Sequence, residues 1–437
     1  MNREIIKRRL LEQQEYVKRI LNKPLIPREK FNQYQNYLET SLIKAIIGPR
    51  RAGKTTLGFL LLEQKDSSYV NFDDEILSTI HQEEYGLLLE ILNELFGKKT
   101  YLFFDEIQNI PSWELFVNRL HRLDYNILLS GSNSKLLSKE LSSHLGGRTL
   151  TLEIFPFSFK EFLITKQIKN IAETDEGIGK IKNQLKEYIE WGGYPEIIIE
   201  LSDSELKKRY LNELFDTIIF RDITQRFKIK YTTELVALAN IIINQFSARA
   251  NLSKISRDLG ISVHTIQKYI SYLEEAYLIA SSKKFSYKPR EMESSFKKYY
   301  CIDTGLLNAK KTTLTTDFGK LIENVVAIEL KRQGIDLYYY MVDNKYEVDF
   351  VIQENNKIKE IIQVVNDEKE IPKREMKTGL LACKKLKSKT LIIITWNNEE
   401  KSEKDGITIL IKPLWKWLMN HNQPNLKNTA EQDKIPV

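Results

Sequence analysis

The sequence has few of the residues that build metal centres or disulfides. Its two cysteines, Cys301 and Cys383, lie far apart, and neither belongs to a Cys-x-x-Cys pair. We therefore expect two reduced thiols. The five histidines are scattered along the chain, so a zinc site built on them is not expected.

Long apolar runs are absent as well. No run reaches the roughly 18–20 residues that a transmembrane helix requires. The N-terminal stretch MNREIIKRRLLEQQ is charged and has a helical pattern, unlike a signal peptide. We expect a cytoplasmic protein without a membrane partner.

The composition is that of an ordinary globular protein, with 42% hydrophobic and 29% charged residues. At about 150 residues per domain, the 437 residues suffice for about three domains. The net charge of +7, from 66 basic and 59 acidic residues, permits a polyanionic partner without demanding one. No internal repeat is visible, and the polar residues 421–437 predict a flexible tail.

The strongest signal is a glycine-rich loop between a strand and a helix. Residues 42–47 form an apolar strand, GPRRAGKT matches the pattern G-x-x-x-x-G-K-[ST], and TLGFLLLE continues as a helix. The motif requires this context on both sides. The residues predicted to bind the nucleotide are Gly48, Pro49, Arg50, Arg51, Ala52, Gly53, Lys54, Thr55 and Thr56.

The residue types in this loop have physical roles. Gly48 and Gly53 let the backbone turn its N–H groups toward a phosphate at the positive end of the following helix. Lys54 is placed to contact the β- and γ-phosphates, and the Thr55 hydroxyl to ligate Mg²⁺. The loop therefore predicts ATP and Mg²⁺ as cofactors.

A further apolar strand ends in two carboxylates. In KTYLFFDEIQNI, four consecutive apolar residues precede Asp105 and Glu106, as in a strand buried on both faces of a parallel sheet. Asp105 is placed to hold Mg²⁺, and Glu106 to polarise the attacking water. A solvated turn is the alternative, favoured only without the upstream loop. The pair predicts ATP hydrolysis.

Arg148 stands between a glycine pair and another predicted strand, in LGGRTLTLEIF. At this position its guanidinium could contact a phosphate of its own ATP, or of a neighbour's ATP in a homo-oligomer. A solvent-exposed arginine is the alternative.

These motifs together resemble a prokaryotic AAA+ family, and most closely its archaeal members. The resemblance rests on GPRRAGKTT, YLFFDEIQNIPSWE, LLSGSNSKLLS, LGGRTLTLEIFPFSFKEFL, WGGYPE, IIFRDI and YEVDFVI, and it extends from Pro27 to Leu418. It implies an α/β protein with a P-loop AAA+ parallel-sheet core, a helical lid, a winged helix-turn-helix and a C-terminal α/β domain of the restriction-endonuclease, PD-(D/E)xK, type.

The implied boundaries are residues 1–40 for an N-terminal helical segment, 41–165 for the AAA+ core, 166–235 for the lid, 236–300 for the winged helix, 301–420 for the endonuclease-like domain and 421–437 for the tail. In AAA+ proteins a polar residue after the fourth strand senses the γ-phosphate, which implies Ser132 or Ser130. A helix N-cap is an equally good alternative for either serine. Arg221 is a second candidate for a nucleotide contact, although an arginine beside an aspartate more often forms a salt bridge.

The stretch NLSKISRDLGISVHTIQKYISYLEEAYLI predicts a helix-turn-helix. Ser253 is expected to cap the first helix, and the second helix places Val263, Ile266, Ile270 and Leu273 on one apolar face. Its opposite face carries the possible DNA contacts, His264, Thr265, Gln267 and Lys268. LIASSKKFSYKPRE is expected to form the strand pair of a wing. The alternative is a rigid spacer that contacts no nucleic acid.

A PD-(D/E)xK nuclease uses a helix glutamate, an aspartate after a hairpin turn, and a strand with carboxylate-x-lysine. The resemblance places Glu323 and Asp349 in the first two positions and Gln363 in the third. Val365 stands in the position of the lysine and offers neither charge nor hydrogen bond. Lys359 shares the face of Gln363 but lies about 13 Å away along a strand. We expect a degenerate site, with an active nuclease as the alternative.

The sequence thus predicts a Mg²⁺-dependent ATPase that couples ATP turnover to DNA binding or remodelling. An alternative is a slow ATP-controlled signalling switch with a protein partner. A third possibility is an ATPase with an active metal-dependent nuclease domain.

Overall fold

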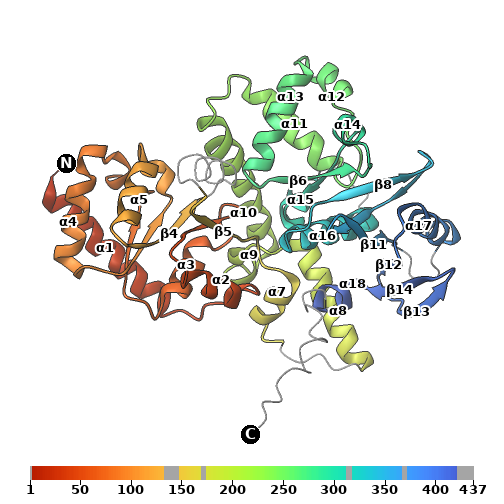
Figure 1. Cartoon of the computed structure of the whole chain (residues 1–437), viewed down its shortest axis with the longest axis horizontal. Helices are drawn as coiled ribbons and strands as arrows, with labels where there is room; N and C mark the ends of the chain where they lie inside the picture. Colours follow the sequence, from red (N-terminus) through yellow and green to blue (C-terminus); the bar gives the residue numbers. More distant parts are fainter. Residues whose placement is uncertain (1, 132–146, 169–173, 312–316, 367–371, 421–437) are drawn as a thin grey trace, which may run out of the picture.

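The computed structural model describes residues 2–131, 147–168, 174–311, 317–366 and 372–420, and its described strands form three sheets. Figure 1 shows the N-terminal sheet at one end of the molecule and the C-terminal sheet at the other, with a largely helical region between them. Within the described ranges, no helix is both long and apolar enough to cross a membrane.

The first sheet is parallel throughout, with the strand order β2-β3-β4-β1-β5. Its strands are β1 (Ile43–Ile47), β2 (Ser67–Asn71), β3 (Tyr101–Asp105), β4 (Asn126–Gly131) and β5 (Thr149–Glu153). β1 and β3 are buried along their whole length, which is why both read as continuous apolar runs. The predicted α/β class with a parallel-sheet core is confirmed.

Helices cover both faces of this sheet. They are α1 (Arg3–Leu21), α2 (Phe31–Leu38), α3 (Lys54–Leu62), α4 (Tyr85–Phe96) and α5 (Trp113–Arg122), with short 3-10 helices η1 (Leu77–Thr79), η2 (Gln82–Glu84) and η3 (Ile107–Asn109). α2 and α3 pack in one apolar core and α4 and α5 in another. α1 closes the β2 edge, where the Gln13 amide pairs with the backbone N–H and C=O of Asn71 at 2.8 and 3.1 Å.

The middle of the chain is mainly helical. Its elements are α7 (Phe159–Thr165), α8 (Asp175–Trp191), α9 (Pro195–Ile199), α10 (Ser204–Thr217), the π-helix η4 (Ile218–Gln225), α11 (Thr232–Asn244), α12 (Leu252–Leu259), α13 (Val263–Glu275), α14 (Pro289–Ser294) and α15 (Thr304–Lys310), with strands β6 (Ile279–Lys284) and β7 (Lys298–Cys301). One apolar core runs from Phe155 to Leu418, so it joins this region to the C-terminal sheet.

α12 and α13 are joined by a turn at Gly260, whose φ of 67° suits glycine. Ile266, Ile270 and Leu273 of α13 are buried, and Val263 is partly buried. The expected cap at Ser253 is wrong. Ser253 lies inside α12, and Asn251 caps the helix because its side chain accepts a hydrogen bond from the Lys254 N–H.

The expected strand pair within residues 278–290 is also wrong. β6 pairs with β7, further along the chain, and the helix α14 lies between them. Pro289 begins α14, where its missing N–H is tolerated but could not serve a strand ladder. β6 also pairs in parallel with β8, so one four-stranded sheet, β7-β6-β8-β9, spans the predicted boundary between residues 300 and 301.

The C-terminal part consists of α16 (Phe318–Arg332), β8 (Tyr338–Val342), β9 (Tyr346–Val348), β10 (Phe350–Glu354), β11 (Lys357–Val364), α17 (Lys373–Leu386), β12 (Thr390–Thr395), β13 (Glu400–Lys404), β14 (Ile407–Pro413) and α18 (Leu414–Asn420). Its five-stranded sheet has the order β10-β11-β12-β14-β13. Asp349 lies in the short break between β9 and β10. Trp415 and Leu418 of α18 are buried, as expected.

Candidate functional site

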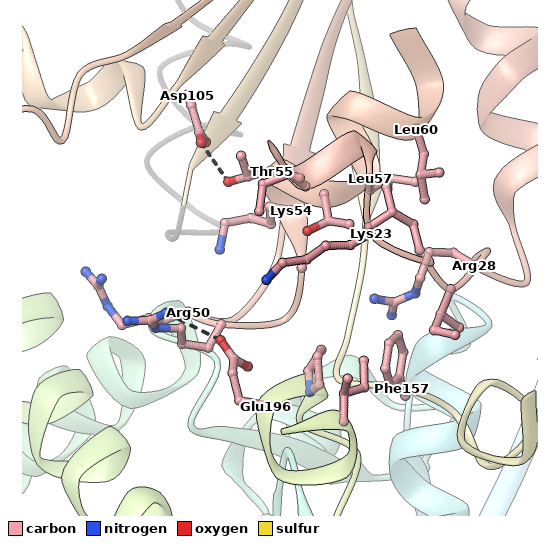
Figure 2. Close-up of a pocket in the computed structure, with 18 of the residues that line it drawn as sticks. Lys23, Arg28, Arg50, Lys54, Thr55, Leu57, Leu60, Asp105, Phe157 and Glu196 are labelled. Atoms are coloured by element: carbon pink, nitrogen blue, oxygen red, sulfur yellow. Dashed lines mark hydrogen bonds and ion pairs between the residues drawn. The ribbon is translucent and has the colours of Figure 1, made fainter. Parts of the chain in front are cut away.

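A cavity of about 550 Å³ lies beside the glycine-rich loop, at the point where β1 ends and α3 begins. Six basic side chains line it: Lys23, Arg28, Arg50, Arg51, Lys54 and Arg221. Figure 2 shows Lys54, Lys23 and Arg28 reaching toward the same space from the loop and from the segment after α1. Of the predicted nucleotide-binding residues, the cavity is lined by all of those from Arg50 to Thr56 except Ala52.

The two glycines of the loop are required by its backbone. Gly48 has a φ of 151°, and a Cβ atom there would lie 2.2 Å from the carbonyl oxygen of Ile154. Gly53 has a φ of 90° and precedes α3 directly, so the loop's N–H groups and the positive end of the helix face the cavity together. A side chain at either position would alter the loop.

Lys54 lies deep at the base of the cavity and is only 6% exposed. Its Nζ donates hydrogen bonds to the carbonyl oxygens of Gly48 and Pro49 at 3.1 and 2.8 Å. Burial lowers the pKa of the Lys54 ammonium, while the carboxylates of Glu106 and Asp105 act in the opposite direction. An anion bound here would therefore be met by a poorly hydrated ammonium group.

Asp105 is the centre of a buried hydrogen-bond network. Its Oδ2 accepts from the Thr55 hydroxyl at 2.6 Å and from the Tyr69 hydroxyl at 3.0 Å, and its Oδ1 accepts from Ser130. Burial, followed by the charge of Glu106, raises the pKa of Asp105, and the three hydroxyl contacts oppose that rise. The predicted metal ligands Thr55 and Asp105 are thus in direct contact, and Tyr69 is a third partner that sequence reasoning missed.

Glu106 follows Asp105 in a left-handed backbone conformation, with a φ of 50°. Its carboxylate accepts a hydrogen bond from the Gln108 amide, and its backbone N–H contacts the Ser130 hydroxyl at 3.4 Å. Glu106 also lines the cavity. The strained backbone turns this side chain away from the strand direction and into the space next to Thr55 and Lys54.

Among the predicted sensor residues, Ser130 lies at the end of β4, between β3 and β1, where it donates to Asp105. Ser132 lies outside the described residues. Ser130 is buried and is not among the residues that line the cavity, so a contact with the γ-phosphate stays a prediction.

Two known proteins are similar to this chain over most of its length. Over 399 residues the chain is 39% identical to an uncharacterized protein of Methanocaldococcus jannaschii, which covers 87% of this chain and 88% of that protein. It is 31% identical over 415 residues to an uncharacterized protein of Haemophilus influenzae, with 90% and 99% covered. A family model described as an AAA domain matches residues 40–163. The chain therefore belongs to the same family as these two proteins, and its residues 40–163 match an AAA domain.

Two further family models, both described as domains of unknown function, match residues 182–317 and 318–416. Among solved structures, a Walker-type ATPase of Pyrococcus abyssi shares 16% identity with a TM-score of 0.44, covering 65% of this chain and 96% of that one. NtrX of Brucella abortus in complex with ATP shares 14% identity with a TM-score of 0.24, covering 60% and 72%. At these TM-scores neither likeness supports a conclusion about this chain.

Arg148 does not contact the phosphate loop of its own AAA domain. It precedes β5, and Ile43 at the start of the parallel strand β1 donates its N–H to the Arg148 carbonyl at 2.9 Å. The loop begins after the opposite end of β1, about 16 Å away at 3.3 Å per residue. The prediction of a phosphate contact within one chain is therefore wrong, because the glycine pair in the sequence does not reveal which end of the strand it adjoins. A contact with a neighbouring chain stays a prediction.

Three other arginines that line the cavity each form an ion pair. Arg50 binds Asp222 of η4 with N–O distances of 2.9 and 2.7 Å. Arg51 lies 3.4 Å from Glu196, and Arg221 pairs with Asp73 after β2. Arg221 thus forms a salt bridge, but with Asp73 and not with its sequence neighbour Asp222, and its side chain still lines the cavity.

Sequence reasoning missed the segment before the loop. Arg28 is buried, with its guanidinium 3.0 Å from Glu161, 2.8 Å from the Ala52 carbonyl and 5.0 Å from the centre of the Phe157 ring. It holds residues 24–28 against the loop, so that Leu25 and Ile26 contribute an apolar end to the cavity. The motif IPRE was the available signal for this segment, since its arginine directly follows the apolar residues 24–27 and requires a partner if it is buried with them.

The exposed face of α13 is the one predicted for DNA contacts. His264, Gln267 and Lys268 are exposed and Thr265 is partly exposed. The Ser262 hydroxyl caps α13 by accepting the Thr265 N–H at 3.1 Å. In the wing region, Lys283 and Lys284 pair with Glu293 and Glu291, which reduces the positive charge there.

The carboxylates of the predicted nuclease site surround a buried lysine. Lys298 of β7 is 1% exposed, and its Nζ lies 2.5 Å from Glu323, 2.8 Å from Glu347 and 3.7 Å from Asp349. Burial raises the pKa of both Glu323 and Asp349, and Lys298 opposes this rise. In the part of the chain that the structure describes, no group of histidines, cysteines and carboxylates is arranged to hold a metal ion.

The two other residues considered for this site have partners outside the cluster. The Gln363 amide donates to Glu375 at 3.1 Å, and Asp349 accepts the backbone N–H of the next residue, Val364, at 2.8 Å. Lys359 is exposed and pairs with Glu354. The lysine beside the carboxylates comes instead from β7, a strand that sequence spacing alone would not place there.

Proposed function

We propose that the AAA domain binds ATP with Mg²⁺ in the cavity and hydrolyses it. The observation that carries this proposal is the contact between Thr55 and Asp105 at 2.6 Å, which joins the glycine-rich loop to the carboxylate strand at the base of the cavity. Lys54 and Glu106 line the same space. These groups are the ones that phosphoryl transfer requires, and they come from two parallel strands, β1 and β3, that both pair with β4.

The oxygen donors fit a Mg²⁺ ion. A hydroxyl and a carboxylate, Thr55 and Asp105, are hard ligands of the kind that Mg²⁺ prefers, and their proximity lets both face one ion directly or through water. Bound Mg²⁺ would neutralise charge on the β- and γ-phosphate oxygens.

The protein groups have distinct tasks in the proposed reaction. Lys54 exchanges its carbonyl partners for phosphate oxygens, and the loop N–H groups orient the triphosphate. Glu106 accepts a proton from the attacking water as the bond between the γ-phosphorus and the β–γ bridging oxygen breaks, leaving ADP and phosphate. Ser130 and Tyr69 hold Asp105 in place from the side away from the cavity.

The opposite end of the cavity suits the nucleobase. Ile20, Leu25, Ile26, Leu57, Leu60 and Ile199 line the cavity, and Figure 2 shows Leu57 and Leu60 on the side away from Asp105. Lys23 extends between the two ends, as Figure 2 shows. Within the described ranges no carboxylate forms an ion pair with it, so its ammonium is available to the ribose or the phosphates.

The test is the variant Glu106→Gln, which keeps the size of the side chain and removes the base. We expect nucleotide affinity within about threefold of wild type and a turnover that falls by about 100-fold or more. Affinity is measured by calorimetry and turnover by phosphate release. A variant that turns over like wild type would exclude Glu106 from the chemistry. Wild-type protein that binds no ATP with Mg²⁺ would refute the proposed function itself.

We further propose that ATP turnover is coupled to duplex DNA held by α13. The exposed His264, Gln267 and Lys268 on a well-capped helix support this role. DNA affinity should fall steeply with salt, and Lys268→Ala should weaken binding and reduce the salt slope by about one. A rate of ATP turnover that does not change when single-stranded, duplex or branched DNA is added would favour the slow signalling switch instead.

A further inference from the structure

The π-helix η4 contacts the phosphate loop on one side. The Arg50 guanidinium and the Asp222 carboxylate form a two-point pair, with Nε–Oδ2 at 2.9 Å and Nη2–Oδ1 at 2.7 Å. Asp222 is 6% exposed, and the Arg50 side chain 18%. Pairs of this geometry fix the orientation of both groups, and removing one partner leaves a buried charge without compensation.

A second ion pair also joins η4 to the AAA domain, and here the arginine belongs to η4 and the carboxylate to the AAA domain. Arg221 of η4 binds Asp73, which follows β2 of the AAA domain. Both arginines line the cavity close to Lys54. Two guanidinium groups that a triphosphate could attract are therefore held by carboxylates at the contact between η4 and the AAA domain.

The chain just after η4 contacts α13. Phe227 stacks on Tyr272 with ring centres 3.8 Å apart and planes inclined by 12°. Ile218 and Ile223 of η4 share the apolar core that contains Ile266 of α13. η4 cannot shift its register without changing these contacts, because a packed core does not deform continuously.

η4 differs in its helical spacing from the helix that precedes it. It has the wide π spacing over eight residues, whereas the preceding α10 has α-helical spacing. π-helical turns are rare and are found mostly at functional sites. Reversion of part of η4 to α-helical spacing would rotate Asp222 relative to Phe227, so the two could not both keep their present partners.

We propose that η4 couples nucleotide binding in the cavity to the position of α13. The inference rests on the proposed function. Phosphate oxygens compete with Asp222 for the Arg50 guanidinium, and Asp222, once it has lost that partner, disfavours the present register of η4. The change reaches α13 through Phe227 and Tyr272. Because such coupling is reciprocal, a partner bound to α13 changes the affinity for nucleotide by the same factor.

The first experiment measures the affinity for a non-hydrolysable ATP analogue with Mg²⁺ by calorimetry. Asp222→Asn keeps the shape of the side chain but weakens its hold on Arg50, so we expect about tenfold tighter binding than wild type. In an Arg50→Ala background the same change should have no effect. Glu213→Gln on α10, which breaks the exposed pair with Arg209, is the matched control and should bind like wild type.

The outcomes separate two failures. Wild-type protein that binds no analogue refutes both the proposed function and this inference. Wild-type protein that binds, with Asp222→Asn no tighter or with the same gain in the Arg50→Ala background, overturns the coupling alone.

The second experiment measures amide hydrogen exchange in η4 and the residues after it (218–227) and in α13 (263–275). In wild type, the analogue should lower the protection of both segments, and in Asp222→Asn the first should already exchange faster without it. Phe227→Leu keeps an apolar side chain but removes the ring contact, so residues 263–275 should lose their response while binding stays within about twofold. A response that persists in Phe227→Leu would overturn the proposed route.

Discussion

Asp105 and Asp349 are both buried carboxylates at strand ends, but their charges are balanced in different ways. Asp105 is surrounded by three neutral hydroxyls, and its surroundings open into a cavity lined by basic side chains. Asp349 belongs to a cluster with a buried lysine at its centre. The negative charge of Asp105 is not neutralised by its hydroxyl partners, so it can attract a cation that arrives with a ligand. The charge of Asp349 is already compensated by Lys298. The same residue type thus predicts a binding site in one region and an internal ion pair in the other.

The largest expected effect concerns the first carboxylate. Asp105→Asn removes the charge that would hold Mg²⁺ while keeping the hydrogen-bond acceptor for Thr55, so turnover should fall by about 100-fold or more. The comparable change Asp349→Asn should leave turnover within about twofold. Phosphate release by the two variants, at equal concentrations of ATP and Mg²⁺, measures the contrast. A similar loss in both would remove the distinction between the two regions.

The second prediction tests the internal cation. Lys298→Met leaves Glu323 and Asp349 buried without their partner, so the free energy of unfolding should fall by about 3–5 kcal/mol at alkaline pH. Both carboxyls have a raised pKa in the folded protein, and loss of the lysine raises it further. The stabilisation that comes from their protonation is present at low pH and is lost as the pH rises through the folded-state pKa. Urea unfolding should therefore show a smaller deficit in acid than in alkali.

The exposed lysine of the same region provides the control for that variant. Lys359→Met breaks a surface pair with Glu354, and its cost should stay below about 0.5 kcal/mol at every pH. An equal deficit for Lys298→Met at all pH values would mean that lost packing, rather than unpaired charge, is responsible.

A third buried carboxylate, Asp303, is held by backbone N–H groups and not by hydroxyls, as Asp105 is, or by a lysine, as Asp349 is. It accepts the N–H groups of Gly193, Gly305 and Leu306 at 2.7, 2.9 and 3.1 Å, and burial raises its pKa to about 6. Because the folded pKa lies above the usual value of 3.8, this group stabilises the fold below about pH 4, and that contribution is lost as the pH rises to about 6.

Asp303→Asn should remove this slope. The unfolding free energy of wild type relative to the variant should fall by on the order of 2 kcal/mol across that range, as measured by urea unfolding at several pH values. A difference that does not change with pH would show that the three N–H donors fully offset the burial of the charge.

The smallest expected effect is at Tyr69, whose hydroxyl supports Asp105. Tyr69→Phe deletes one buried hydrogen bond and keeps the ring contacts with Phe59 and Phe103, so the free energy of unfolding should fall by about 1–2 kcal/mol. Turnover should fall less than in Asp105→Asn, because Thr55 and Ser130 still orient the carboxylate. Thermal unfolding and phosphate release on one preparation measure both effects.

Much of the AAA domain could be predicted from its local pattern. The apolar strands β1 and β3, the glycine-rich loop and the pair Asp105–Glu106 each occupy consecutive residues, and parallel pairing brings their carboxyl ends to one edge. The apolar face of α13 was also predictable, because helical periodicity places Ile266, Ile270 and Leu273 together. The failures were of another kind. Arg148 was considered for a phosphate contact although it lies at the end of β5 away from the loop, and Lys298 of β7, the lysine beside the carboxylates, was not considered.

The sequence by itself determined the loop, the strands that carry its chemistry and the amphipathic helices, since these depend on neighbours a few residues apart. Only the tertiary structure decided which charges meet: Arg50 with Asp222, 172 positions away, and Lys298 with Glu347, 49 positions away. The physical reason is that burying a charge requires a partner, and packing of distant elements selects that partner. The spacing of these residues along the chain therefore does not predict which charges will pair.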